Sequence, residues 1–189
     1  ARTNNLLYCR NLTNAAWVKT TMTTALTSTG LDGNTNSATR LTATGANSKC
    51  LQTITLAAAT RTFSAYVKRI TGTGTIEITR DNGTSWTDIT SLITTGTYSR
   101  VYIAATSVTN PTCGFRIVTS GDAIDVDYCQ DEAGSFPSNP IYTTTVASTR
   151  NTDLLYYMAS GNYSNSSGTI LGGFSYSEVS STLSIQMNA

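Results

Sequence analysis

The sequence predicts an all-β protein, an antiparallel β-sandwich or jelly roll, from three observations. Threonine supplies about one residue in five, and β-branched side chains of this kind favour strands over helices. Apolar and polar residues alternate with a period of two in several short segments, while no segment shows a convincing helical period. Turn sequences such as GTG, DNG, TTG and SGD separate the alternating segments, as expected for strands joined by tight connections.

Six segments carry the alternation that predicts a strand with one polar face. In the clearest of them, RTFSAYVKR (61–69), Phe63 and Val67 point to one face while Tyr66 and Lys68 point to the other. The remaining five predicted strands are 50–56, 75–80, 99–105, 113–119 and 123–129.

Composition excludes several classes of function. Charged residues make up 12% of the chain and the net charge is +1, so we expect neither nucleic acid nor a membrane surface as a partner. Histidine is absent, which removes the commonest general base and metal ligand. No run approaches the roughly 18 apolar residues of a membrane helix, and the N-terminus lacks the pattern of a signal peptide.

The chain divides into three parts by composition. Residues 1–133 are expected to form the jelly-roll sandwich. Residues 134–150 contain two of the three prolines and few strand-forming runs, so they predict an extended strap that leaves the sandwich. Residues 151–189 alternate again but end before a core could be completed. They predict either the start of a second β domain or an arm that pairs with a neighbouring subunit.

The four cysteines are spaced too widely for the paired-cysteine motifs of a zinc site. Two disulfides are possible. We favour Cys9 with Cys129 and Cys50 with Cys113, because terminal strands of a sandwich often lie side by side. The alternative is four free thiols packed as small hydrophobic side chains.

Residues 79–86, TRDNGTSW, resemble a motif that recurs in sialidases. The segment lies between two predicted strands, so Asp81 and Gly83 are expected to form a hairpin turn. Trp86 on the returning arm can cover the core or lie exposed. We interpret the motif as a structural lock and Asp81 as a turn former, not as a catalytic acid.

A larger resemblance covers roughly residues 5–150. Three patterns carry it: the opening N-x-x-x-A-x-W that ends at Trp17, the FSAYVKR strand, and the closing pattern of Asp127, Gln130 and Glu132 before a proline-containing strap. In these patterns the chain resembles a carbohydrate-binding-module-like jelly roll found in bacteriophage virion proteins. The resemblance implies a sandwich presented on a virion surface that binds glycan or joins structural parts. It also implies a core position for Trp17.

The same resemblance bears on a metal site. Related modules of polysaccharide-degrading enzymes often hold a structural calcium between an acidic residue near the N-terminus and an aspartate on the last strand. Asp127 matches that aspartate, but CRNLTNAAW offers no acidic partner. We therefore expect no metal and no cofactor.

Glycan binding requires exposed aromatic rings with polar neighbours, because a ring face stacks on the C–H face of a sugar. The candidate residues are Trp86, beside the hairpin tip, Tyr66, on the polar face of its strand, and Tyr98 and Tyr102, which share one face of another strand. Core packing is the alternative for each.

Two further patterns favour structural roles. Asp125 and Asp127 share a strand face about 7 Å apart, near the range of glycosidase carboxylates, but we interpret them as an exposed acidic strand end. Gln130 and Glu132 are expected to bind the backbone of the departing strap. The basic residues are interpreted as scattered surface charges. They are Lys68, Arg69, Arg80, Arg100 and Arg116.

Together with these observations, the resemblance implies a non-catalytic virion component, such as a fibre, tail or capsid-surface protein, that adheres to glycans. One alternative is a purely structural clamp or spacer that assembles with copies of itself and with other virion proteins. The other is an accessory carbohydrate-binding module of a glycan-degrading enzyme.

Overall fold

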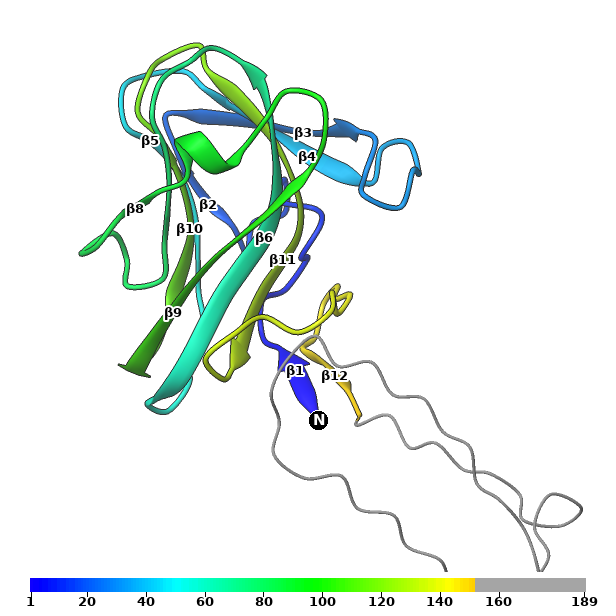
Figure 1. Ribbon diagram of the computed structural model, residues 1–189, viewed down its shortest axis with the longest axis vertical. Coiled ribbons are helices and arrows are strands. Elements are labelled where there is room, and N and C mark those ends of the chain that lie inside the picture. The colour runs from blue at the N-terminus through cyan, green and yellow to red at the C-terminus, as the bar shows by residue number, and fades with distance from the viewer. Residues whose placement is uncertain (152–189) are drawn as a thin grey trace, which may run out of the picture. The chain divides into compact units, whose positions relative to one another are not determined.

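The computed structural model describes residues 1–151, apart from the side chains of residues 105–107. Two five-stranded antiparallel sheets face each other, and a two-stranded ribbon lies at one end of them (Figure 1). The described chain contains one helical element, a 3-10 turn at Thr90–Leu92, and no helix in it is long and apolar enough to cross a membrane. The prediction of an antiparallel jelly-roll sandwich is confirmed.

The first sheet has the strand order β2-β5-β10-β7-β8. Its central strand β10 pairs with β5 on one side and with β7 on the other, both antiparallel. The five strands are β2 (Val18–Thr20), β5 (Ser48–Thr53), β10 (Thr112–Ile117), β7 (Ile76–Thr79) and β8 (Thr87–Asp88).

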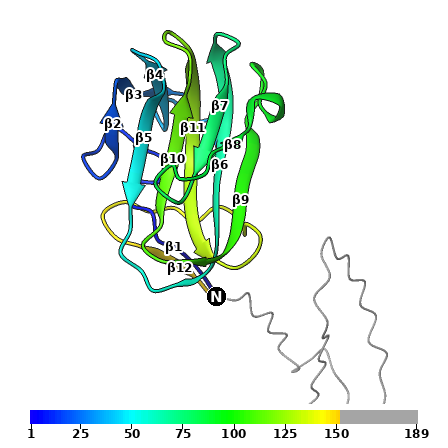
Figure 2. The same cartoon turned by 90° about the vertical axis from the view of Figure 1, so that its left-hand side faces the viewer.

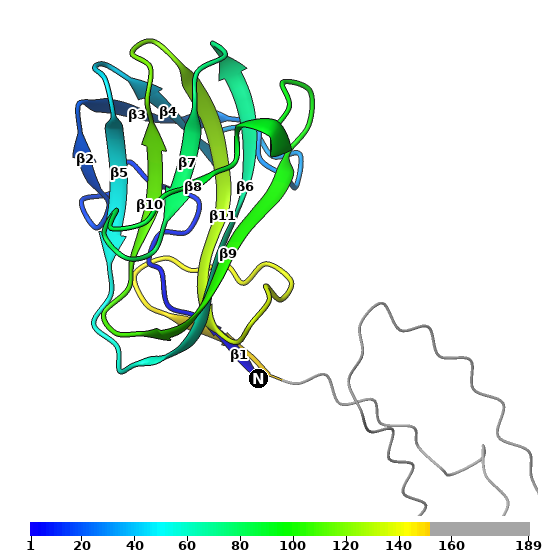
Figure 3. The same cartoon turned by 60° about the vertical axis from the view of Figure 1, so that its left-hand side comes forward.

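The second sheet has the strand order β3-β4-β11-β6-β9, so β9 lies at an edge (Figures 2 and 3). A β-bulge interrupts β11 between Asp127 and Gln130, where Tyr128 has a φ of 45°. The five strands are β3 (Met22–Ser28), β4 (Ala38–Ala43), β11 (Ala123–Ala133), β6 (Ala59–Thr71) and β9 (Ser99–Val108).

The six segments predicted as strands from their alternation all contain strands. They correspond, in chain order, to β5, β6, β7, β9, β10 and β11. Between residues 18 and 43, the structure adds three sandwich strands that the alternation did not indicate. These strands, β2, β3 and β4, complete one side of each sheet.

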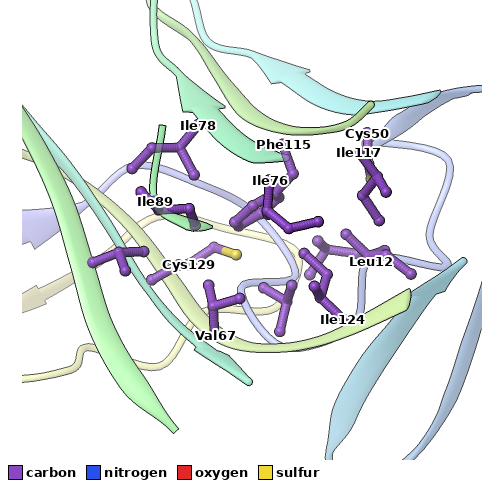
Figure 4. Close-up of a cluster of buried hydrophobic side chains, with 14 of the residues drawn as sticks. Leu12, Cys50, Val67, Ile76, Ile78, Ile89, Phe115, Ile117, Ile124 and Cys129 are labelled. Carbon is purple, nitrogen blue, oxygen red and sulfur yellow. The ribbon is translucent and has the colours of Figure 1, made fainter. Parts of the chain in front are cut away.

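The core fills the space between the two sheets (Figure 4). Phe63 from β6 meets Phe115 from β10 edge to face, with ring centroids 5.8 Å apart and an interplanar angle of 65°. Around this pair lie buried aliphatic side chains from both sheets, including Val67, Ile78 and Ile124. The apolar positions of the period-2 pattern therefore supply the core.

Trp17 lies in this core with 1% of its surface exposed. Its indole Nε1–H donates to the backbone oxygen of Leu7 at 3.1 Å, which pairs the one polar atom of the side chain. The side chain of Gln52 donates to the same oxygen at 3.0 Å. Gln52 of β5 thus ties the segment before β2 to the first sheet.

Cys50 and Cys113 are buried free thiols, and the disulfide predicted between them is absent. In the ladder between β5 and β10, Cys50 lies opposite Phe115 and Cys113 lies opposite Gln52, so the two cysteines are diagonal neighbours. Such diagonal positions are about 7–8 Å apart, which exceeds the Cα separation that a disulfide spans. Burial raises the pKa of the Cys50 thiol to about 12.

Cys9 and Cys129 are likewise buried free thiols, and their predicted disulfide is absent. The two backbones do lie side by side, because the Cys129 N–H donates to the Cys9 oxygen at 2.8 Å. The Cys9 sulfur instead accepts the Thr143 N–H at 3.2 Å. All four thiols therefore pack as small hydrophobic side chains.

The N-terminus and the end of the strap meet in a short ribbon. β1 (Arg2–Asn4) pairs antiparallel with β12 (Ser148–Arg150) at one end of the sandwich (Figures 1 and 2). The strap predicted at 134–150 is irregular up to residue 147. Apart from Asn151, the predicted second β segment (151–189) lies outside the described residues.

Candidate functional site

Tyr66, Arg100 and Tyr102 lie side by side on the outer face of the second sheet. Ala65 and Val67 of β6 belong to the core, so Tyr66 between them points outward. In the ladder between β6 and β9, Tyr66 lies directly opposite Arg100. Tyr102 is two residues further along β9 and therefore on the same face. The two tyrosines are diagonal neighbours, within reach of one ligand.

These three side chains differ in their accessibility. Tyr102 is 54% exposed. Tyr66 is partly buried, and the Arg100 guanidinium carbon lies 5.5 Å from the centroid of its ring. Arg100 also donates to the Ser64 hydroxyl at 3.4 Å and to the backbone oxygen of Ser138 in the strap. The site thus combines an open ring with a ring covered by a cation.

Tyr98 stands immediately before β9 and extends this surface. Its hydroxyl donates to the backbone oxygen of Thr29 at 2.9 Å, and the Lys68 ammonium lies 4.7 Å from the centroid of its ring. Burial, together with the nearby Asp125 carboxylate, raises the pKa of Tyr98. The hydroxyl therefore remains protonated and keeps its role as a donor.

Asp125 is buried beneath these side chains, so its prediction as part of an exposed acidic strand end is wrong. It is 1% exposed. Its carboxylate accepts hydrogen bonds from the Ser28 hydroxyl at 2.6 Å and from Arg40 Nε at 2.9 Å, and the Lys68 ammonium lies 3.6 Å away. Buried carboxylates require such cations and donors, and here they come from β3, β4 and β6.

Asp127 is buried as well, and its surroundings do not fit a calcium ion. Its carboxylate accepts Arg10 Nε at 2.7 Å and Arg10 Nη2 at 3.0 Å, and the Leu31 N–H donates to it at 2.8 Å. Calcium needs six to eight oxygen ligands, whereas this carboxylate is surrounded by donors. Among residues 1–151, no group of three or more acidic or cysteine side chains is placed to hold a metal.

Gln130 and Glu132 contact the strap where it crosses the outer face. The Ile141 N–H donates to the Gln130 amide oxygen at 2.7 Å. Glu132 accepts the N–H of Ser138 at 2.6 Å and its hydroxyl at 2.7 Å. Because Ser138 also accepts from Arg100, the strap forms one border of the tyrosine site.

Trp86 lies on a different surface from the three tyrosines. Its ring lies near Arg116 of β10, with 4.4 Å from guanidinium carbon to ring centroid, and near Lys49 of β5, at 5.8 Å. Arg116 alternates with the core residues Phe115 and Ile117, so it points outward from the first sheet. Trp86 therefore cannot share a site with the second-sheet tyrosines.

Asp81 and Gly83 form the hairpin turn that places Trp86. Asp81 accepts the Ser85 N–H at 2.9 Å and the Thr79 hydroxyl at 2.8 Å. Although burial opposes the shift, these hydrogen bonds lower the pKa of Asp81. Gly83 has a φ of 75°, and an added Cβ would lie 2.7 Å from the Trp86 ring. Both residues thus serve the geometry of the turn.

The interpretation of the basic residues as scattered surface charges is wrong for several of them. Arg69 and Arg80 are 7% and 8% exposed, and Arg69 Nη1 lies 3.5 Å from the Asp122 carboxylate. Lys68 and Arg100 belong to the tyrosine site. A sequence signal for these last two existed, because each stands two residues from a candidate tyrosine on an alternating strand.

We name the outer-face cluster of Tyr66, Lys68, Tyr98, Arg100 and Tyr102 the tyrosine face. It offers one open aromatic ring, two cationic groups, and a border formed by the strap. Such a surface can stack on an apolar ring face and bind polar or charged oxygens beside it. The carboxylates beneath it already accept hydrogen bonds from the protein's own cations and hydroxyls.

Comparisons of the sequence identify no relative. No protein-family model matches the chain, and no curated protein sequence matches it.

Comparisons of the structure find similar sandwiches. The CBM22-1 xylan-binding domain from Paenibacillus barcinonensis Xyn10C is 11% identical over 69% of this chain and 92% of that chain, with a TM-score of 0.48. An exo-beta-agarase is 8% identical over 69% of this chain and 25% of that chain, at 0.49. Tailspike protein 4 of Bacteriophage CBA120 is 15% identical over 68% of this chain and 21% of that chain, at 0.46. At these identities, the likeness concerns the fold alone.

Proposed function

We propose that residues 1–151 form a non-catalytic glycan-binding module and that the tyrosine face is its binding surface. The observation that carries this proposal is the placement of Tyr66, Arg100 and Tyr102 next to one another, with Tyr102 54% exposed. An exposed ring beside hydrogen-bonding side chains is the arrangement that recognises sugars. Trp86, on the other sheet, has no part in this site.

We further propose that the module belongs to a bacteriophage fibre, tail or capsid-surface protein and acts at the virion surface. The support for this setting is the sequence pattern that ends at Trp17 and the closing pattern of Asp127, Gln130 and Glu132. An accessory module of a glycan-degrading enzyme would use the same surface. The binding site and the biological setting are therefore separate proposals with separate tests.

Substitution of Tyr102 tests the binding surface. We expect Tyr102→Ala to weaken binding to any polysaccharide that the wild-type protein binds by about tenfold or more, because loss of a stacked ring removes more than about 1.4 kcal/mol of binding free energy. Binding is measured by calorimetry across a panel of bacterial, plant and algal polysaccharides. Trp86→Ala, on the outer face of the first sheet, is the control and should leave the affinity unchanged. Dependence on Trp86 instead of Tyr102 would contradict the proposed site.

Self-assembly is a second candidate function, favoured by the edge strand β9. Its ladder with β6 runs without interruption from Ser99 to Ala105. Of the described residues of this strand, 99–104 and 108 make no backbone hydrogen bond outside the ladder. The single charge of β9, Arg100, turns onto the sheet face. Natural edges are usually blunted by charges, prolines or short length, as in the two-residue β8 at an edge of the first sheet.

For this second candidate, we propose that β9 pairs antiparallel with β9 of a second copy. Ala104→Lys, at an exposed position of β9, should convert a dimer of the full chain into a monomer, because it places a charge at the pairing edge. Sedimentation velocity over a range of concentrations measures this. Thr23→Lys, on the opposite edge strand β3, is the matched control. A wild-type monomer, or a dimer that survives Ala104→Lys, would exclude pairing through β9.

A further inference from the structure

We infer that the tyrosine face binds acidic glycans, in which carboxylate or sulfate groups accompany the sugar rings. This inference rests on the proposed glycan-binding function and narrows its ligand class. It follows from three features of the site: cations cover two of its rings, its carboxylates lie deeper than its cations, and its central arginine lacks an acidic partner.

The first feature is the position of the cations relative to the rings. The Arg100 guanidinium carbon lies 5.5 Å from the centroid of Tyr66, and the Lys68 ammonium lies 4.7 Å from that of Tyr98. Both distances fall within the range of a cation–π interaction. A ligand that approaches these two tyrosines therefore meets a positive charge beside each ring. Among the described contacts, Tyr102 is the tyrosine of this face with no cation over its ring.

The second feature is the depth of the opposite charges. Asp125, the carboxylate nearest the site, has a side chain that is 2% exposed. The side chains of its partners Arg40 and Lys68 are 40% and 19% exposed. Solvent, and any ligand, thus contacts the cations and not the carboxylate between them. Such an arrangement presents a positive potential toward the ligand although the chain is nearly neutral.

The third feature is the incomplete bonding of Arg100. Within residues 1–151, no carboxylate lies within 4.0 Å of this guanidinium. Its Nε is buried and has no hydrogen-bond partner. Its Nη2 donates to the Ser64 hydroxyl and to the Ser138 backbone oxygen, both of them neutral acceptors. A guanidinium without a carboxylate partner is suited to bind an oxyanion, because its donors match two oxygens at once.

The geometry also relates the charge to the open ring. Arg100 and Tyr102 are two residues apart on one strand face, about 7 Å along the strand. A sugar ring stacked on Tyr102 can therefore place its own acidic group, or that of the next sugar, at Arg100. Lys68 lies beyond Tyr66 on the neighbouring strand and can receive a second acidic group of a polymer.

Matched pairs of probes test this inference. Calorimetry compares oligogalacturonate with its neutral methyl ester, κ-carrageenan with agarose, and sialyllactose with lactose. We expect the acidic member of at least one pair to bind about tenfold more tightly than the neutral member. The difference should shrink as salt rises, because exposed charges are screened. Arg100→Gln and Lys68→Gln should each reduce it. Arg116→Gln, which changes a cation beside an aromatic ring on the first sheet, should leave it unchanged.

The possible results separate this inference from the proposed function. Neutral members that bind as tightly as their acidic partners, or more tightly, with a dependence on Tyr102, would overturn the inference and leave the proposed glycan site intact. An acidic preference that survives Arg100→Gln and Lys68→Gln together also overturns it. Absence of binding to every probe, by folded protein, rejects both the inference and the proposed function.

Discussion

Replacement of Asp131 by alanine is expected to destabilise the protein by about 3–5 kcal/mol, because it leaves a buried arginine without its counter-charge. Asp131 is fully buried and Arg61 is 5% exposed. Arg61 Nε donates to the two carboxylate oxygens at 2.9 and 3.2 Å, and Arg61 Nη2 makes a further contact with the same carboxylate. Urea unfolding followed by circular dichroism measures the loss.

The control for this prediction removes both charges. Arg61→Met combined with Asp131→Leu should recover much of the lost stability, since apolar side chains of similar volume replace a buried ion pair at little cost. A value below about 1 kcal/mol for Asp131→Ala alone would show that the pair is solvated. That result would contradict the burial of this end of the sandwich.

Trp17→Ala is expected to cost about 3–5 kcal/mol, because it leaves a large cavity in the core. Trp17 is 1% exposed and is among the largest fully buried side chains of the described chain. Circular dichroism during urea unfolding is the suitable probe, since the substitution removes one of the two tryptophans that fluorescence would follow.

Trp17→Phe is the matched variant for this position. It keeps much of the buried volume and removes the indole N–H. The Leu7 oxygen retains its hydrogen bond from Gln52 at 3.0 Å, so no buried acceptor is left unpaired. The phenylalanine variant should therefore lose less than half as much stability as the alanine variant. Equal losses would assign the effect to the hydrogen bond and not to packing.

The strands of the core were predictable because alternation there separates the face toward the hydrophobic core from the outer face. In RTFSAYVKR, the apolar residues Phe63, Ala65 and Val67 belong to the hydrophobic core, while the buried polar residues Thr62 and Ser64 lie on the other face. The missed strands have a different character. In β3, MTTALTS, only the terminal residues Met22 and Ser28 are buried, and threonines occupy most positions between them. A strand at the edge of a sheet gains its place from its neighbour, which its own sequence does not describe.

The acidic residues of β11 show why the site was harder to predict than the fold. Asp125 and Asp127 have the spacing of a polar strand face, and the alternation correctly puts them on the outer side. Their burial depends on distant partners. Asp127 pairs with Arg10, which is 117 residues away in the chain, and Asp125 pairs with Arg40, which is 85 residues away. Local sequence carries no record of such partners. The same holds for the cysteines, whose positions relative to one another depend on how distant segments pair.

The candidate aromatic residues lie on two different sheets for a similar reason. Tyr66 and Tyr102 are far apart in the chain but meet because β6 pairs with β9. Trp86 follows β7, which belongs to the other sheet. Sequence alternation identified the outward faces, while the strand order decided which of those faces coincide.

The measurement that tests the central claim most directly is a two-dimensional NMR titration of isotope-labelled protein with a glycan that it binds. We predict shifts at the backbone amides of Tyr66, Arg100 and Tyr102, with no shift at the indole N–H of Trp86, which reports on the outer face of the first sheet. Shifts confined to Trp86 and its hairpin, with the tyrosine face unchanged, would contradict the account and move the site to the opposite sheet.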